Sequence, residues 1–144
     1  MLYDYLYDLF LAARGEFFED GMESYFSRGL EAAIQTHKHL AVGVLRVLVV
    51  DIHLSPSVVG EAMRWIGSVD EPDTWECRRS LLEYCLEHPN PEVRDGAGLG
   101  LAAMDDPKAI PAVWRAINRE QLSILRRGLQ QVLDQLVETR DNHP

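Results

Sequence analysis

Three cap residues, each followed by proline and an amphipathic run, constrain the fold of this chain more than any other feature. They are Ser55-Pro56, Asn90-Pro91 and Asp106-Pro107. Ser, Asn and Asp side chains accept hydrogen bonds from the free amides of a first helical turn, and proline is well tolerated at the first helical position. Asp73 and Glu76 also have the spacing of a capping box. These signals predict helices that begin near residues 56, 74, 91 and 107.

Apolar residues recur at every third or fourth position, which is the period of a helix with one buried face. They predict about eight helices, over residues 2–14, 21–36, 38–53, 56–67, 74–87, 91–104, 107–118 and 121–139. The most regular stripes are Val93, Ala97, Leu101 and Met104, and Leu122, Leu125, Leu129, Val132, Leu133 and Leu136. The aromatic residues at positions 3, 7, 10, 25 and 26 and the three tryptophans are also expected in the core.

Such stripes must be covered by neighbouring helices, because an isolated helix of this length is marginally stable in water. The connections are short, which favours antiparallel neighbours. The predicted fold class is therefore all-α, a short α-solenoid of antiparallel helix pairs. We expect one domain over residues 1–139, followed by a frayed C-terminal tail at 140–144.

Residues 81–101, LLEYCLEHPNPEVRDGAGLGL, and their continuation DDPKAIPAV at 105–113 resemble a HEAT repeat. In that family the second helix of a unit opens with a Val-Arg pair, here Val93-Arg94. The resemblance covers about residues 74–138 and implies a helical stack that binds other proteins. The family usually places an aspartate in the turn before Val-Arg, where this chain has His88 and Asn90. We therefore expect Arg94 to pair locally, with Glu87, instead of with a neighbouring repeat.

The charge of the chain restricts its partners. Twenty-three acidic and fourteen basic residues give a formal net charge of −9, of which −6 lies in residues 1–72. Nucleic-acid phosphate would be repelled, because affinity for it comes from Lys and Arg. A basic protein would be attracted. The alternative interpretation is that the acidity only keeps the protein soluble.

An acidic cluster surrounds the predicted first inter-helix turn. We interpret it, with two carboxylates of the first helix, as a partner-binding surface made of an acidic rim around aromatic anchors. Its candidate residues are Asp4, Asp8, Glu16, Phe17, Glu19, Asp20 and Glu23. The alternative is a solvated turn with no binding role.

Gly96, Gly98 and Gly100 lie inside the predicted helix 91–104, where each glycine costs about 1 kcal/mol relative to alanine. Their spacing differs from that of a dinucleotide-binding loop. One interpretation is the close approach of a neighbouring helix. The other is a flattened face against which a partner's backbone can lie.

No residue pattern indicates catalysis or a cofactor. His37, His39 and His53 lack the spacing of three or four that would join metal ligands on one helix. Cys77 and Cys85 are too far apart on one predicted helix to form a disulfide. The longest apolar stretch, residues 40–54, is too short to span a bilayer and no signal peptide is visible, so we expect a cytoplasmic location.

The sequence therefore predicts a non-enzymatic protein-binding module, with neither nucleic acid nor a membrane as partner. Its most concrete form is a small acidic bacterial immunity or antitoxin-type inhibitor of a basic toxin. The first alternative is a scaffold or regulatory subunit of a larger complex, in which the chain can also form homo-oligomers. A nucleic-acid-binding or lyase-type helical-repeat enzyme is a third possibility, against which the −9 charge and the lack of a specified pocket argue.

Overall fold

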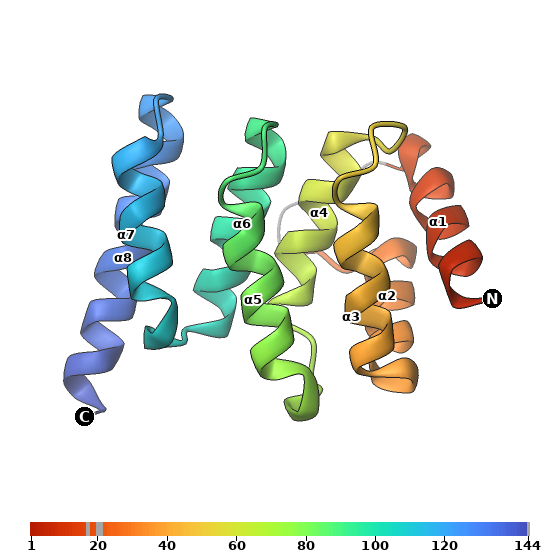
Figure 1. Ribbon diagram of the computed structural model, residues 1–144, viewed down its shortest axis with the longest axis horizontal. Helices are drawn as coiled ribbons and strands as arrows, with labels where there is room; N and C mark the ends of the chain where they lie inside the picture. The colour runs from red at the N-terminus through yellow and green to blue at the C-terminus, as the bar shows by residue number, and fades with distance from the viewer. Residues whose placement is uncertain (17, 20–21, 144) are drawn as a thin grey trace.

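The computed structural model describes residues 1–16, 18–19 and 22–143. This part of the chain forms eight α-helices and no β-strand (Figure 1), which confirms the predicted fold class. The helices are α1 (Leu2–Ala12), α2 (Tyr25–His37), α3 (His39–Leu48), α4 (Pro56–Ile66), α5 (Trp75–Cys85), α6 (Pro91–Met104), α7 (Ile110–Arg119) and α8 (Ser123–Asn142). Single 3₁₀ turns lie at Ala13–Gly15, Pro72–Thr74 and Pro107–Ala109.

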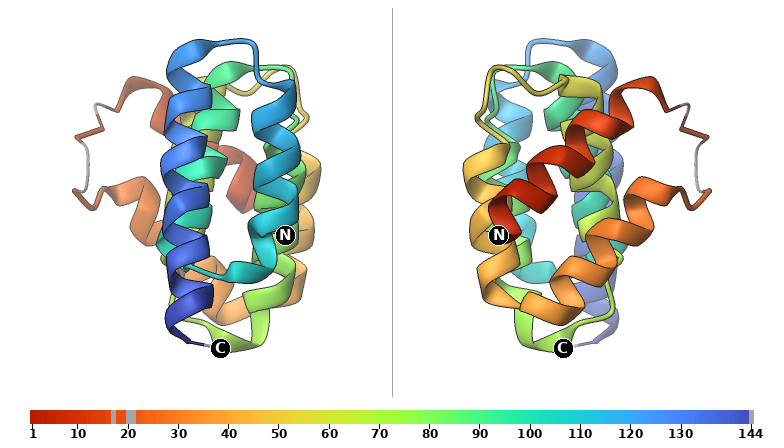
Figure 2. Two further views of the ribbon diagram at one scale, coloured as in Figure 1. Left: turned by 90° about the vertical axis from the view of Figure 1, so that its left-hand side faces the viewer. Right: turned by 90° about the vertical axis from the view of Figure 1, so that its right-hand side faces the viewer.

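The helices from α3 onwards run alternately up and down and form two layers (Figure 1). One layer contains α3, α5 and α7, and the other contains α4, α6 and α8. The first pair, α1 and α2, covers one end of the stack and runs obliquely to the other helices (Figure 2). The last pair, α7 and α8, forms the opposite end. One long edge of the stack therefore carries the α3–α4, α5–α6 and α7–α8 turns.

The cap signals locate three of the predicted helix starts. Helices α4 and α6 begin at Pro56 and Pro91, and the Asn90 side chain accepts a hydrogen bond of 2.8 Å from the Glu92 amide. Asp106 accepts one of 3.0 Å from the Lys108 amide, but it opens a 3₁₀ turn that continues into α7. Ser55 makes no capping hydrogen bond with its side chain.

The predicted capping box at Asp73 and Glu76 is wrong. Asp73 lies inside the 3₁₀ turn, so Thr74 takes the cap position of α5 and makes no capping bond with its side chain. The Glu76 carboxylate instead accepts a hydrogen bond of 2.7 Å from Arg79. A real capping box begins α2, where Ser24 and Ser27 each accept the other's backbone N–H.

The apolar stripe of α6 faces the core as predicted, with Val93, Ala97, Leu101 and Met104 all buried. The stripe of α8 is confirmed in its centre, because Leu129, Val132 and Leu136 are buried. Leu122 is exposed, since it precedes the first turn of α8 as its cap residue.

Replacing Leu101 with alanine should lower the free energy of unfolding by about 2–5 kcal/mol, because the side chain is fully buried and the vacated space cannot collapse. Chemical denaturation at constant pH measures the change. Leu99→Ala is the matched control in the same helix, since Leu99 is exposed, and its effect should be far smaller. Equal losses for the two variants would contradict the assigned burial of α6.

A seam of glycines joins α4 to α6. A Cβ added at Gly60 would lie 2.5 Å from the Glu92 carbonyl oxygen, and one added at Gly96 would overlap the Gly60 carbonyl. Gly67 and Gly100 make the same kind of contact, with the carbonyls of Gly100 and Met63. The two helices therefore touch backbone to backbone along this seam, which requires glycine on both sides.

Gly98 faces a different helix from Gly96 and Gly100. A Cβ at Gly98 would approach the Leu129 side chain of α8 at 3.2 Å. Gly96 and Gly100 thus have α4 as their close neighbour, and Gly98 has α8. All three glycines are buried within the chain.

The aromatic residues divide between the core and the surface. Phe10 and Phe26 are buried and meet edge to face, with ring centroids 5.0 Å apart. Tyr3 and Tyr25 are exposed, which corrects the expectation that they lie in the core. Trp114 is 58% exposed, because α7 turns Ala112, Val113 and Ala116 towards the core instead.

A buried arginine holds the connection between α4 and α5. The Arg78 side chain is completely buried and donates hydrogen bonds to Thr74 Oγ1 at 2.8 Å, the Ile66 carbonyl at 2.9 Å and the Glu71 carbonyl at 3.1 Å. Its guanidinium carbon lies 5.6 Å from the centroid of the Trp75 ring. Burial lowers the pKa of Arg78 from its ordinary value. The side chain thereby satisfies polar backbone groups where α4 ends.

Candidate protein-binding surfaces

The first helix exposes two of the predicted binding carboxylates. Asp4 and Asp8 are exposed on α1, because Leu6, Leu9 and Phe10 turn the other face of that helix into the core. The two carboxylates are one helical turn apart and so share a face. Since α1 covers the end of the stack, this face points away from the other helices (Figure 2).

The predicted acidic cluster is described in part. Glu19 and Glu23 are exposed and Glu16 is half-buried, while Phe17 and Asp20 lie outside the described residues. We call Asp4, Asp8, Glu19 and Glu23 the acidic end. Within the described part of the chain, none of the four forms an ion pair.

Exposed aromatic side chains accompany the acidic end. Tyr3 and Tyr5 project from α1, and Tyr25 from the start of α2. Tyr5 also lines a shallow hollow of about 410 Å³ between α1 and α2, with Ala32 and His37 on its other side. This end of the stack therefore combines unpaired negative charge with exposed tyrosines, which are typical of energetically important contacts in protein interfaces.

Ion pairs link the later helix pairs in sequence. Lys38 pairs with Glu71 across the α2–α3 and α4–α5 turns. Arg79 of α5 donates to Asp106 in the α6–α7 turn at 2.8 Å, where Trp75 Nε1 donates to the same carboxylate at 2.8 Å. Burial alone would raise the pKa of Asp106. Hydrogen bonds from the Lys108 amide, Trp75 and Arg79 lower the pKa by more than burial raises it, so the pKa lies below its ordinary value.

Arg94 takes part in this linkage, which corrects the expectation of a local pair with Glu87. Its guanidinium donates to both carboxylate oxygens of Glu120, at 2.9 and 3.1 Å, and to the His88 and Pro89 carbonyls at 3.0 Å. Glu87 pairs with Arg119 instead. The inter-repeat pair forms because Glu120, in the α7–α8 turn, supplies the acid that the α5–α6 turn lacks.

His88 links the α5–α6 turn to the preceding pair of helices. Its Nδ1 accepts a hydrogen bond of 3.0 Å from the Asn90 amide, so its Nε2 carries the proton and donates to the Val49 carbonyl at 2.8 Å. His88 and Arg94 together connect three successive turns along one edge of the stack.

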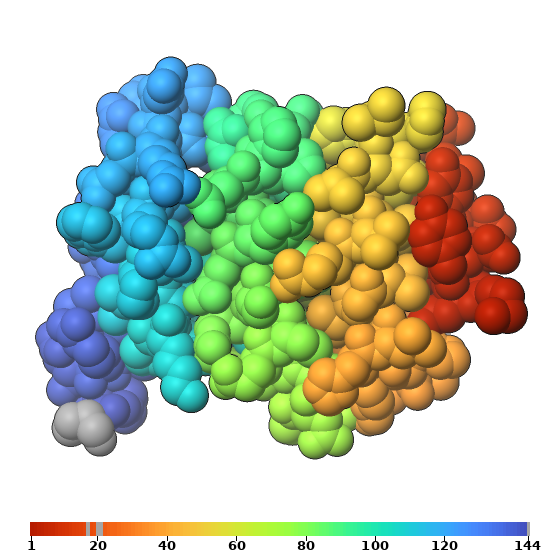
Figure 3. All heavy atoms as spheres, viewed as in Figure 1, coloured from red at the N-terminus to blue at the C-terminus, as the bar shows by residue number. Residues whose placement is uncertain are grey.

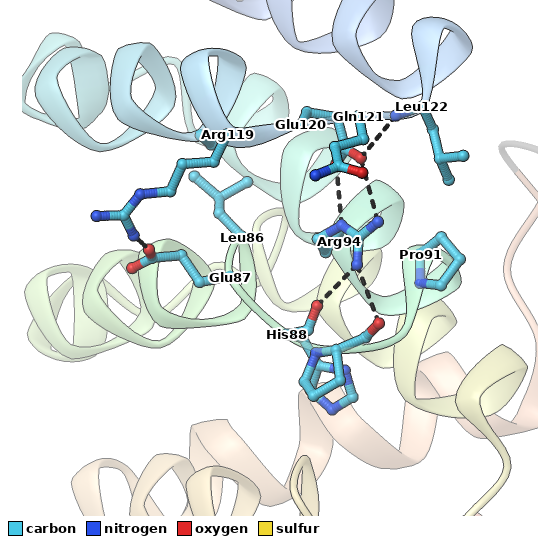
Figure 4. Close-up of a pocket in the computed structure, with 11 residues that line it drawn as sticks. Leu86, Glu87, His88, Pro91, Arg94, Arg119, Glu120, Gln121 and Leu122 are labelled. Atoms are coloured by element: carbon cyan, nitrogen blue, oxygen red, sulfur yellow. Dashed lines mark hydrogen bonds and ion pairs between the residues drawn. The ribbon is translucent and has the colours of Figure 1, made fainter.

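The Arg94–Glu120 pair forms the floor of an open cavity of about 590 Å³ (Figure 4). Figure 4 shows Leu86 and Pro91 beside this pair and the exposed Arg119–Glu87 pair at the rim. Both arginines of the cavity are paired with carboxylates, so the site offers no free positive charge to an anionic ligand. The cavity suits a small part of a protein surface better than a phosphate or carboxylate.

Glu120 should make stability depend on acid pH. Burial raises its pKa, but hydrogen bonds from Arg94 and the Leu122 amide outweigh burial and hold the pKa below its ordinary value of 4.5. The folded protein therefore binds its proton less readily than the unfolded chain. The resulting stability is present above about pH 4.5 and is lost as the pH falls through the lower, folded-state pKa.

Glu120→Gln should accordingly reduce the free energy of unfolding by about 1–3 kcal/mol near neutral pH, since it leaves Arg94 without its charged partner. The difference from the wild type should begin to shrink as the pH falls below about 4.5 and should become small below the lower folded-state pKa of Glu120, where the folded wild-type carboxylate is also uncharged. Denaturant titrations at several pH values measure both effects. Glu138→Gln, which changes an exposed glutamate on α8, is the control and should show neither.

A second, more apolar hollow of about 310 Å³ lies on the other side of the α5–α6 turn. Val50 and Ile52 of the α3–α4 turn line it together with Pro89, and Ile52 is 90% exposed. Leu122 and Ile124 are exposed where the α7–α8 turn enters α8. The edge that carries these turns therefore has exposed apolar side chains beside both hollows. We call Val50, Ile52, Leu122 and Ile124 the turn edge.

The layer of α3, α5 and α7 forms the face shown in Figure 3. Leu40 and Val47 of α3, Tyr84 of α5 and Trp114 of α7 are its exposed large apolar side chains. Tyr84 lines a hollow of about 180 Å³ between α5 and α7, opposite Ala112 and Arg115. Apolar exposure on this face is scattered over three helices.

Within the described residues, no group of three or more His, Cys, Asp and Glu side chains is placed to hold a metal ion. His37 and His39, considered as ligands from the sequence, lie on either side of the α2–α3 turn. No helix in the described part of the chain is long and apolar enough to cross a membrane.

These features define an all-α solenoid of helix pairs, linked by ion pairs between successive turns and carrying exposed apolar and acidic surfaces. The chain belongs to the HEAT repeat family, whose model matches residues 45–134. The match extends further towards the N-terminus than the resemblance noted from the sequence. Proteins of this family generally mediate protein–protein interaction and are typically non-catalytic. Searches of curated proteins and of solved structures each found no match.

Proposed function

We propose that this chain is a non-catalytic inhibitor of the immunity or antitoxin type, which binds a basic protein toxin through its acidic end. The observation that carries the proposal is the set of unpaired carboxylates, Asp4, Asp8, Glu19 and Glu23, beside exposed tyrosines. A basic surface would neutralise these charges and accelerate its own association. The tyrosines would supply the apolar part of the contact.

The distribution of ion pairs supports this assignment. Lys38, Arg79 and Arg94 are each engaged with a carboxylate of the chain itself, in its middle and C-terminal parts. These ion pairs are neutral in sum, so the formal charge of −9 comes from the other carboxylates of the chain, of which the acidic end holds four. The proposed location in the cytoplasm, where an antitoxin meets its toxin before export, is part of the same hypothesis.

The experiment uses basic proteins encoded beside this chain in its genome. Each is purified, mixed with the 144-residue chain and tested for a complex and for loss of its toxic activity. The expected result is a complex whose affinity falls steeply with added salt, together with inhibition. A neighbour-encoded toxin that stays fully active in the presence of excess chain, or the absence of any complex, contradicts the proposal.

A double variant tests the acidic end itself. Asp4→Asn with Asp8→Asn should weaken the complex by about tenfold and flatten its salt dependence, because two steering charges are removed. Asp134→Asn with Glu138→Gln removes the same charge from exposed positions of α8 and serves as the matched control. Equal weakening by the two double variants would show that only net charge matters, and the acidic end would lose its assignment.

The turn edge favours a second candidate function, that of a scaffold or regulatory subunit. Its exposed side chains, Val50, Ile52, Leu122 and Ile124, flank two hollows and suit a more apolar partner than a basic toxin. Binding to such a partner should resist salt, and Ile52→Asp should disrupt it while the acidic-end variants leave it unchanged. The salt dependence of the complex therefore distinguishes the two candidates.

A further inference from the structure

The partly buried ion pairs between successive helix pairs share one direction along the chain. In Lys38–Glu71, Arg79–Asp106 and Arg94–Glu120, the base precedes the acid by 33, 27 and 26 residues. Each helix pair thus offers a base to an acid in the following unit. Two pairs, Arg119–Glu87 and Lys108–Glu76, have the opposite order, but the side chains of both pairs are largely exposed.

At the C-terminal end of the stack, this pattern leaves a base without its acid. Arg126 is the fourth residue of α8, as Arg94 is the fourth residue of α6. Arg94 donates to two carbonyls of the preceding turn and to the Glu120 carboxylate of the next unit. Arg126 donates to the Glu120 carbonyl at 2.8 Å and forms no ion pair with a described residue. Arg127 beside it is also exposed and forms none.

At the N-terminal end, acidic side chains lack a base, and they lie within α1 and not in a turn as Glu71, Asp106 and Glu120 do. Asp4 and Asp8 face away from the stack on α1, and no described basic side chain pairs with them. The two ends therefore differ in charge. Residues 1–37 contain seven acidic and two basic side chains, whereas residues 110–144 contain four acidic and five basic ones.

Both ends also carry exposed aromatic side chains. Tyr3 and Tyr5 lie beside Asp4 and Asp8 on α1, and Trp114 is exposed on α7. On α7, Ala112 and Arg115 face the hollow towards α5. By helical periodicity, Trp114 then lies on the side of α7 turned away from α5, where the face of the α3, α5 and α7 layer meets the C-terminal end of the stack. Aromatic and arginine side chains are the residues most enriched at the centres of protein interfaces.

We infer that the C-terminal end of one copy of this chain docks against the N-terminal end of a second copy, so that the solenoid continues from molecule to molecule. Arg126 and Arg127 of one copy pair with Asp4 and Asp8 of the next, which repeats the direction of the ion pairs inside the chain. Trp114 packs against Tyr3 and Tyr5. Because the two faces differ, each added copy exposes a fresh end and the assembly does not close after two molecules unless its rotation forms a ring.

This inference does not depend on the proposed function, but it adds a consequence to it. A basic partner and a second copy would use the same carboxylates, Asp4 and Asp8. Self-association would therefore compete with binding of a basic protein, and dilution would free the acidic end. Measurements on the isolated chain test self-association without any partner, so the two proposals fail separately.

The test is sedimentation velocity of the purified chain over a wide concentration range. At low ionic strength the average mass should rise with concentration above the monomer mass of 16.4 kDa. At about 0.5 M salt, where charges are screened within a few ångströms, it should return towards the monomer. A chain that stays monomeric at millimolar concentration and low salt overturns the inference.

Two charge-reversed variants identify the faces. One is Arg126→Glu with Arg127→Glu, and the other is Asp4→Arg with Asp8→Arg. Each alone should remain monomeric, and their mixture should associate, because opposite charges again meet at every interface. The first variant keeps its N-terminal face, so a dimer through two N-terminal ends would still form. The second variant keeps its C-terminal face, so a dimer through two C-terminal ends would still form. A dimer of either variant alone would overturn head-to-tail docking.

Controls keep the result interpretable. Lys108→Glu with Arg115→Glu makes the same change in net charge at exposed positions whose side chains face α5 and not the open side of the last helix pair, and it should associate like the wild type. Thermal melting of every variant shows whether it folds. Should Arg126→Glu destabilise the fold through loss of its bond to Glu120, Trp114→Ser gives an independent reading of the same face. Association of Trp114→Ser as strong as that of the wild type would contradict the proposed packing.

Discussion

Gly96→Ala is expected to lower the free energy of unfolding by about 3 kcal/mol or more, a large effect for the addition of one methyl group. The new Cβ would overlap the carbonyl oxygen of Gly60, which belongs to the backbone of α4 and cannot rotate away. Either helix can make room only by opening the seam along its length. Denaturant unfolding followed by circular dichroism measures the loss.

Gly128→Ala is the matched control for this prediction. Gly128 also lies inside a helix, α8, but apart from the adjacent residues and backbone of that helix no described atom lies within 4 Å of the position its Cβ would take. Alanine should stabilise the protein there by about 1 kcal/mol, from helix propensity alone. If Gly96→Ala were stabilising as well, α4 and α6 would not be in backbone contact.

Arg78→Met is expected to cost about 3 kcal/mol or more, because three buried acceptors each lose a hydrogen bond, of which only the Glu71 carbonyl keeps the bonds from the Thr74 amide and hydroxyl. These are the Thr74 hydroxyl and the carbonyls of Ile66 and Glu71. Methionine fills much of the space, so the loss reports the hydrogen bonds more than a cavity. Thermal or denaturant unfolding measures it.

Arg115→Met provides the comparison, since Arg115 is exposed on α7 and its replacement should change stability by less than about 0.5 kcal/mol. Arg78→Lys adds a second test, because it keeps the positive charge but cannot reach three acceptors in a fork. It should recover only part of the loss. Full recovery by lysine would mean that charge alone, without the fork of hydrogen bonds, stabilises the α4–α5 connection.

The helices could be predicted because their signals are local. Pro56 and Pro91 begin helices where the cap-proline pairs place them, and the stripe through Val93 and Leu101 is buried as its period requires. The box formed by Ser24 and Ser27 was missed, since serine replaces the usual Glu or Gln at its third position.

The contacts between helices could not be predicted in the same way. The acid that pairs with Arg94 is Glu120, which lies 26 residues away and follows another helix, whereas the sequence suggested nearby Glu87. Arginine is usually a surface residue, but Arg78 lies in the core, where the Ile66 and Glu71 carbonyls accept its hydrogen bonds. The requirement for glycine at positions 60 and 67 can be seen only when the position of α6 is known, because the backbone of α6 is what a Cβ there would strike.

The candidate surfaces were predicted unevenly. The exposure of Asp4 and Asp8 could be predicted from the sequence, because it follows from the spacing of the apolar residues of α1. The unpaired state of Arg126 was not, because it depends on the comparison with Arg94 and on where α8 ends the stack. Exposed Trp114 was missed, since a tryptophan in an amphipathic helix is usually buried.

The contact between α4 and α6 also determines how the molecule can deform. Two backbones in van der Waals contact cannot be compressed further, and lateral sliding would drive carbonyls into the glycines. On the opposite layer, α5 and α7 are separated by a hollow lined by flexible side chains. Bending of the stack is therefore expected between α5 and α7, whereas α4 and α6 should move together as one rigid unit.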